Sequence, residues 1–215
     1  EEIRRYARMV ANEHPERDAS DERVRGTFRV ARAWDESPQY RGVTVEVDDS
    51  AFVEAYHRPG QYVTFDPGEL EPHFLVIASA PSADGRDHTT TWDFLIDVDS
   101  DLGDASSQLD AGDEVQVSMP EGSGYPSADV AGRPLLMFTT GSGIASMRPV
   151  IQYWGRDRDA GPSSMALYYG EVDEDDFAYA DEFPDWRTWG LRLFRAIENL
   201  PHPEEGFQYV QHAFD

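Results

Sequence analysis

The residues best suited to chemistry in this sequence form a short glycine turn, Gly141-Ser142-Gly143. An apolar segment, Pro134–Thr140, predicts a strand leading into the turn, and Ile144–Tyr153 predicts a helix leaving it. Glycines allow a tight bend and the close approach of a ligand, and a helix start offers unpaired N–H groups. The pattern therefore indicates a pyrophosphate site at Gly141 and Gly143, although such turns also arise for steric reasons alone.

The other reactive side chains give no comparable signal. The six histidines lack the spacing of metal ligands, so no metal site is expected. Ser79 and Ser142 have no recognisable His and Asp partners, which argues against a hydrolase triad. Carboxylates are too numerous for any pair to indicate a glycosidase.

Six short segments with alternating apolar residues follow a polar head, residues 1–22, whose apolar side chains have helical spacing. These segments are Thr27–Ala33, Gly42–Val47, Gln61–Phe65, Phe74–Ala80, Thr91–Val98 and Glu114–Ser118. Turn-forming residues separate them, and one brief helix is expected at Asp104–Leu109. This half of the chain predicts a small antiparallel β-barrel.

Strands and helices alternate after Gly132. The expected strands are Pro134–Thr140, Met165–Tyr169 and Leu191–Ala196, and the expected helices are Ile144–Tyr153 and Glu174–Phe183, with a helix or turn at Tyr209–Phe214. Such alternation is typical of a parallel, doubly wound sheet. With a boundary near Val130–Arg133, we expect a polar N-terminal head (1–22), a β-barrel domain (23–131) and an α/β domain (132–215).

The composition limits the partners of the chain. Its 18 basic residues, all arginine, face 42 acidic ones, which gives a net charge of −24. A surface this negative repels nucleic acid and anionic lipid, and no apolar run is long enough to span a membrane. Without cysteine, the chain cannot form disulfides or hold a Cys-ligated iron–sulfur cluster. The even spread of acidic residues favours a halophilic cytoplasmic protein, with an acidic docking face for a cationic partner as the alternative.

Several motifs, in order, resemble the ferredoxin–NADP reductase superfamily. The stretch Gly141-Ser142-Gly143-Ile144-Ala145-Ser146-Met147-Arg148 is similar to that family's Gly-Thr-Gly-Ile-Ala-Pro-x-Arg. Four further segments are similar in the same order: Pro59–Val63, Ile77–Pro81, Leu167–Gly170 and Gly206–Gln211. The resemblance implies a FAD-binding barrel followed by an NAD(P)-binding α/β domain. It also implies that the second domain is incomplete, because the family's last strand and helix are missing.

The resemblance assigns the flavin ring to His73-Phe74-Leu75-Val76, at the place of the family's Arg-x-Tyr-Ser/Thr motif. None of that motif's chemistry is kept, so FAD is expected with altered contacts, extended along the strand by Ile77, Ala78 and Ser79. Gly103 and Ser106 lie in a stretch similar to the family's Gly-x-x-Ser helix, whose start faces the FAD pyrophosphate. Asp104 at that start would compete with the phosphate, so a purely structural role stays open.

The resemblance assigns the nicotinamide cofactor to the second domain. Gly141, Gly143 and Ile144 would hold its pyrophosphate, Gly170 would lie at the adenosine ribose, and the catalytic candidates Thr140 and Ser142 would lie near the nicotinamide. Glu171 and Asp173 follow Gly170 where NADP-binding proteins often carry an arginine. Carboxylates there repel a 2′-phosphate and accept hydrogen bonds from ribose hydroxyls. NAD is therefore favoured over NADP, unless these acids belong to the general acidic surface.

Together these features predict a flavin-dependent oxidoreductase that transfers a hydride from NAD(P)H to FAD and electrons onward to an unidentified acceptor, such as a redox protein. The alternative is a non-catalytic nucleotide- or flavin-binding module, regulatory or electron-transferring, with the same fold. The lost Arg-x-Tyr-Ser chemistry favours the module, whereas the coherent order of motifs favours the enzyme.

Overall fold

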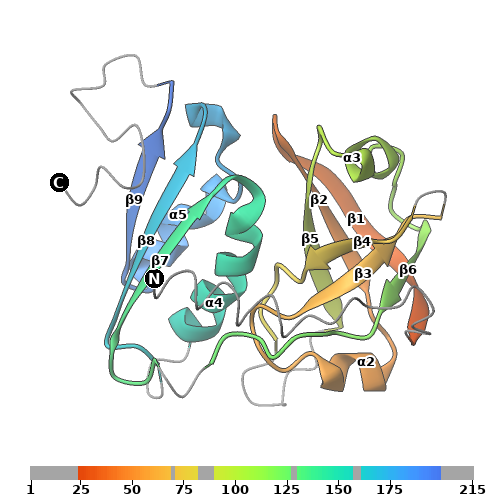
Figure 1. The fold of residues 1–215 in the computed structure, drawn as a ribbon, viewed down its shortest axis with the longest axis horizontal. Helices are drawn as coiled ribbons and strands as arrows, with labels where there is room; N and C mark the ends of the chain where they lie inside the picture. Colours follow the sequence, from red (N-terminus) through yellow and green to blue (C-terminus); the bar gives the residue numbers. More distant parts are fainter. Residues whose placement is uncertain (1–23, 69–70, 82–89, 127–129, 157–160, 200–215) are drawn as a thin grey trace, which may run out of the picture.

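The computed structural model describes residues 24–68, 71–81, 90–126, 130–156 and 161–199. Within them, an antiparallel six-stranded sheet stands beside a parallel three-stranded sheet (Figure 1). The predicted fold class, an antiparallel β-barrel followed by an α/β domain with a parallel sheet, is confirmed. The head at 1–22, the Gly206–Gln211 motif and the helix or turn expected at Tyr209–Phe214 lie outside the described residues.

The first sheet has the strand order β4-β3-β6-β1-β2-β5. Its strands are β1 (Arg25–Ser37), β2 (Tyr40–Glu46), β3 (Tyr62–Asp66), β4 (His73–Val76), β5 (Thr91–Asp97) and β6 (Glu114–Ser118). The barrel is not fully closed, because β4 and β5 stand at the two ends of the strand order. Just beyond β4, the Ala78 amide donates to the Asp93 carbonyl of β5 at 2.7 Å, which brings these two edges together. Alternate residues of the strands point inward and bury a core that includes Val30, Val43 and Phe94, each 0% exposed.

Strand and helix boundaries in this domain differ from the prediction. Strand β1 is longer than the expected Thr27–Ala33, because its start pairs with β6 and its remainder with β2. Strand β4 ends at Val76, before the expected Ala80. Helix α3 (Asp101–Ser106) begins three residues earlier than expected, because the Ser100 hydroxyl caps it. The short helix α2 (Ser50–Ala55), capped by Asp49, was not predicted.

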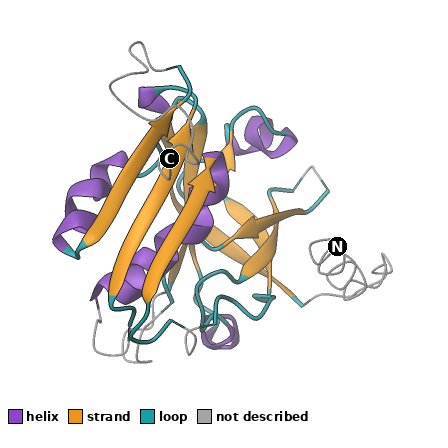
Figure 2. Cartoon of the chain, turned by 60° about the vertical axis from the view of Figure 1, so that its left-hand side comes forward, coloured by secondary structure: helices purple, strands orange, loops and turns teal. Residues whose placement is uncertain are grey.

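The second sheet has the order β7-β8-β9, with all strands parallel (Figure 2). Its elements are β7 (Pro134–Thr140), the 3-10 turn η1 (Gly141–Gly143), α4 (Ile144–Arg156), β8 (Ser164–Glu171), the 3-10 turns η2 (Glu174–Asp176) and η3 (Ala180–Glu182), α5 (Phe183–Thr188) and β9 (Leu191–Ile197). Helix α4 lies between this sheet and the barrel (Figure 1).

The prediction of a helix at Glu174–Phe183 was wrong. That stretch forms η2 and η3, separated by residues 177–179, of which Tyr179 is in a left-handed conformation (φ 61°). The helix begins only at Phe183. Local chemistry accounts for the difference. The acidic run forms a capped turn at Asp173–Asp176, and Pro184 occupies the first turn of α5, where proline is favoured.

The two domains share a hydrophobic core. Three barrel residues, Tyr40, Ala78 and Leu95, are buried in the cluster formed otherwise by the α/β domain. The seam between the sheets is therefore packed rather than an open hinge. In the described ranges no helix is long and apolar enough to cross a membrane.

Candidate cofactor site at the domain seam

The glycine turn lies at the carboxyl end of β7, the edge of a parallel sheet where ligands of α/β folds bind. Gly141 has φ 59°, a left-handed conformation that glycine adopts without strain. A Cβ on Gly143 would lie only 2.6 Å from the Thr139 Oγ1. The fold itself thus requires both glycines, as the steric alternative anticipated.

The turn nevertheless has the features of an anion site. Thr140, Ser142 and Gly143 are exposed, while Ile144 is fully buried and anchors the start of α4. The first N–H groups of a helix have no partner within it, and the 13-residue α4 directs its positive dipole end here. The residues present therefore fit a pyrophosphate.

Strand β4 offers a surface for a ring. His73, Leu75 and Val76 are half-buried, and Phe74 is 59% exposed with its ring edge-on to Tyr62 at 5.7 Å. Successive side chains of a strand face opposite sides, so Phe74 and Val76 share one face while Leu75, on the other, packs against the barrel core. Phe74 and Val76 thus offer an apolar surface to a flat ring, without the charge or hydroxyl of the family's motif.

The chain after β4 is engaged in the seam. Ile77 and Ala78 are both 0% exposed, the first in the barrel core and the second in the shared core. The Ser79 hydroxyl accepts from the Asp93 amide at 3.1 Å, and its carbonyl accepts from the Tyr56 hydroxyl. Cofactor contact by Ile77, Ala78 and Ser79 stays a prediction that this burial does not favour.

Helix α3 is closed by its own packing. Ser106 is 0% exposed, and its hydroxyl donates to the Gly103 carbonyl at 2.9 Å. A Cβ on Gly103 would lie 2.2 Å from the Val98 carbonyl oxygen, so glycine is needed for close approach to the chain after β5. Neither residue offers a free group to a phosphate, and a pyrophosphate site here stays a prediction without support from the described contacts.

Glu171 turns inward rather than toward a ribose. Its Oε1 accepts from the Tyr169 hydroxyl at 2.5 Å, and its Oε2 accepts a long hydrogen bond of 3.4 Å from the Tyr40 hydroxyl of the barrel. Burial raises the pKa of Glu171 to about 7, against the lowering effect of the two tyrosine hydrogen bonds. Gly170 before it is buried, whereas Asp173 after it is exposed.

Arg148 forms the ionic part of the seam, and the sequence reasoning assigned it no role. Its Nη1 donates to the Ala78 carbonyl (2.9 Å) and the Asp93 carboxylate (2.8 Å), both in the barrel domain. Its Nε and Nη2 donate to Glu182, and the guanidinium lies 4.4 Å from the Tyr179 ring centre. Arg148 closes the quoted Gly…Arg motif, so its position was visible in the sequence but its partners were not.

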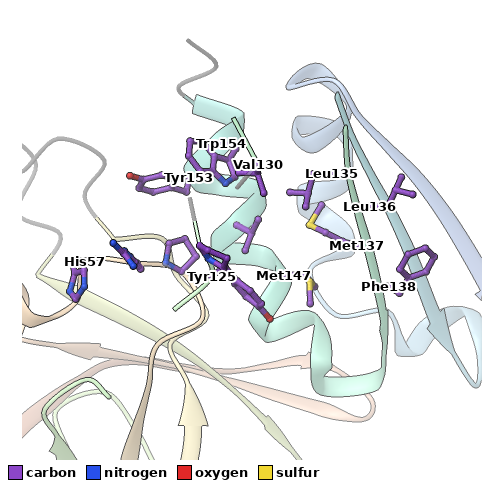
Figure 3. Close-up of a pocket in the computed structure, with 14 residues that line it drawn as sticks. His57, Tyr125, Val130, Leu135, Leu136, Met137, Phe138, Met147, Tyr153 and Trp154 are labelled. Carbon is purple, nitrogen blue, oxygen red and sulfur yellow. The ribbon is translucent and has the colours of Figure 1, made fainter. Parts of the chain in front are cut away.

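Two cavities border the seam. One, of about 400 Å³, is mostly apolar and lies between α4, β7 and the barrel loops at His57 and Tyr125 (Figure 3). The other, of about 480 Å³, is polar and lies beside Arg148 and Tyr179. None of the predicted cofactor residues lines either cavity. Within the described part of the chain, no group of three or more His, Asp or Glu side chains could hold a metal ion.

An antiparallel barrel joined to a parallel sheet whose first strand ends in a glycine turn defines a two-domain type of fold. Among the solved structures that share it are two reductases. A ferredoxin NADP+ reductase from Neisseria gonorrhoeae with bound FAD and NADP matches with a TM-score of 0.70 at 15% identity, over 86% of this chain and 73% of that chain. The cytochrome P450 reductase GcoB of Amycolatopsis matches with a TM-score of 0.70 at 20% identity, over 92% of this chain and 61% of that chain. The chain therefore shares the fold of these two reductases, which agrees with the resemblance of its motifs at the level of the fold.

A curated relative, the self-sufficient cytochrome P450 monooxygenase CYP505U2 of Exserohilum turcicum (strain 28A), is 29% identical over 157 residues. The match covers 66% of this chain but only 15% of that protein, so this chain corresponds to a small part of its relative. No family model matches the chain.

Proposed function

We propose that this chain is the FAD- and NAD(P)H-binding part of an oxidoreductase that takes a hydride from NAD(P)H and passes electrons to an acceptor. The observation that carries the proposal is the exposed turn Gly141–Gly143 at the carboxyl edge of the parallel sheet, next to the barrel. The Neisseria gonorrhoeae reductase, which has the same fold, has FAD and NADP bound.

The chain's own residues bind and orient. Backbone amides at Gly141–Gly143 receive the dinucleotide pyrophosphate, with Ser142 adding a hydroxyl and Thr140 lying at the strand end beside it. Phe74 and Val76, which share one face of β4, cover one face of the flavin ring and exclude water from it. Bound FAD supplies the conversion between two-electron and one-electron transfer. No side chain is required as an acid or base for this step.

We further propose NAD rather than NADP as the dinucleotide. Exposed acidic residues follow Gly170, and Asp173 is the best acceptor for a ribose hydroxyl because Glu171 is buried. Arg195 of β9, opposite Tyr169 in the sheet, is already paired with Glu174. A 2′-phosphate would therefore meet carboxylates and an arginine that is already paired.

The direct test combines cofactor loading with one matched pair of variants. The purified protein is incubated with FAD, freed of excess and titrated anaerobically with NADH; retention of yellow colour and its bleaching are the expected results. Ser142→Asp adds a carboxylate at the proposed anion site and should weaken NADH binding about tenfold or more. Ser164→Asp, at the start of β8 and so at the edge of the sheet opposite the glycine turn, should not weaken NADH binding.

Each outcome separates the candidates. A protein that binds FAD and NADH without bleaching is the non-catalytic module rather than the enzyme. A colourless protein with no affinity for either cofactor contradicts the proposal altogether. If Ser142→Asp and Ser164→Asp weaken NADH binding equally, the dinucleotide does not bind at the glycine turn.

A further inference from the structure

One barrel side chain, Tyr40, reaches across the seam to the glycine turn. It begins β2, is 5% exposed, and packs in the core of the α/β domain. Its hydroxyl oxygen lies 3.3 Å from the position that a Cβ on Gly141 would take. The same hydroxyl donates to Glu171 Oε2 at 3.4 Å, so Tyr40 touches the ends of both β7 and β8.

Glu171 is held from its other side by the α/β domain. Tyr169 donates to Glu171 Oε1 at 2.5 Å, and the Tyr169 hydroxyl accepts from the Ala178 amide at 3.2 Å. A continuous chain of hydrogen bonds therefore runs from the loop after η2, through β8, to the barrel. A buried carboxylate is costly unless its oxygens are satisfied, and here each oxygen has a tyrosine donor.

We propose that Tyr40 and Glu171 are positioning residues for the dinucleotide: their hydrogen bond holds β2 against Gly141 and so fixes the turn that receives the pyrophosphate. This inference rests on the proposed function. Glu171 acts on the turn through Tyr40 and does not itself contact the cofactor. The arrangement gives the buried acid a role other than the ribose contact expected from the sequence.

The titration of Glu171 then affects binding. Four groups face it: Tyr169 on its own strand, Tyr40 of β2, Asp97 of β5 and Asp176 of η2. Burial and the two aspartates raise the pKa of Glu171, the two tyrosine hydrogen bonds lower it, and the resulting pKa is about 7. A bound pyrophosphate adds negative charge nearby and favours the neutral acid. By linkage, affinity should fall about three- to tenfold between about pH 6 and pH 8.

The test uses ADP-ribose, which carries the pyrophosphate but no nicotinamide. Its Kd is measured by calorimetry across this pH range for the wild type, Glu171→Gln and Tyr40→Phe. Glu171→Gln keeps the shape and one of the two acceptor oxygens without a titratable charge, so the pH dependence should disappear. Tyr40→Phe keeps the ring and should weaken binding about threefold or more. Tyr153→Phe, a half-buried tyrosine of α4, is the matched control and should change neither property.

A second measurement needs no ligand. Hydrogen exchange of residues 139–144 should be at least about threefold faster in Tyr40→Phe than in the wild type and in Tyr153→Phe. If wild-type protein fails to bind ADP-ribose and NADH, the proposed function fails, and exchange still decides the positioning role. Unchanged exchange in Tyr40→Phe, or a wild-type pH profile in Glu171→Gln, overturns the inference. If Tyr40→Phe fails to fold, Glu171→Gln decides it by the pH profile or, if no ligand binds, by its exchange rates.

Discussion

Helices α3 and α4 both begin beside glycines that the sequence analysis assigned to pyrophosphate binding. They differ in whether protein groups already occupy the space that a phosphate would need. At α3, the Gly103 amide donates to the Ser100 carbonyl at 2.8 Å and hydroxyl at 3.1 Å, and the Val98 carbonyl covers its Cα. At the turn before α4, Ser142 and Gly143 are exposed to solvent. A glycine at a helix start is therefore not evidence of a ligand until the packing around it is known.

The largest expected effect is that of a substitution at α3, where protein groups already cover the glycine. Gly103→Ala would force a Cβ to within 2.2 Å of a backbone oxygen, which cannot rotate away. We expect a loss of about 3 kcal/mol in the free energy of unfolding, measured by urea denaturation. The affinity of the folded variant for FAD should stay unchanged. A loss of FAD affinity larger than the loss of stability explains would mean that α3 contacts the cofactor.

Gly141→Ala tests the turn before α4, where Ser142 and Gly143 are exposed to solvent. The left-handed φ of 59° costs about 1–2 kcal/mol for alanine, and the new Cβ would press on the Tyr40 hydroxyl at 3.3 Å. Stability should fall by about that amount, and ADP-ribose affinity should fall about tenfold because the turn is displaced. Gly132→Ala is the matched control: its φ is 68°, with nothing within 4 Å of its Cβ. Gly132→Ala should lose similar stability and no affinity. If both variants lost affinity equally, the ligand would not bind at the turn.

The sequence predicted best what is local. Strand β7, expected at Pro134–Thr140, has those bounds in the structure, because its apolar run and the following glycines define both ends. The direction of Glu171 could not be predicted, because it depends on Tyr40, which is 131 positions away in the chain. The partners of Arg148 are equally remote: Ala78 and Asp93 lie 70 and 55 positions away. Side chains that join the two domains leave no periodic signal in either one.

The pH dependence of stability is expected to come from Glu171, which lies behind the Gly141 turn. No such contribution is expected from the packing around Gly103. The pKa of Glu171 rises from 4.5 to about 7 on folding. The folded state then binds more protons than the unfolded state between these values, so stability falls as pH rises through this window. Glu171→Gln should remove that fall. Its stability relative to the wild type should increase by about 1–2 kcal/mol from about pH 4.5 to pH 7.5, after allowance for solvent screening. A constant difference between the two proteins would mean that Glu171 does not titrate there.

The smallest expected effect separates packing from binding at α3. Ser106→Ala removes a hydroxyl whose bond to the Gly103 carbonyl is internal to the helix, so stability should fall by about 1 kcal/mol. FAD affinity, measured by quenching of flavin fluorescence, should stay within about twofold of the wild type. A serine that contacts the FAD pyrophosphate would instead cost about tenfold, because a charge-assisted hydrogen bond is lost. Ser107→Ala, whose exposed hydroxyl donates to the Asp104 carbonyl in the same kind of bond, controls for the helix itself. A FAD defect confined to Ser106→Ala would mean that α3 rearranges to receive the cofactor, and the contrast between the two helix starts would then be a property of the free protein only.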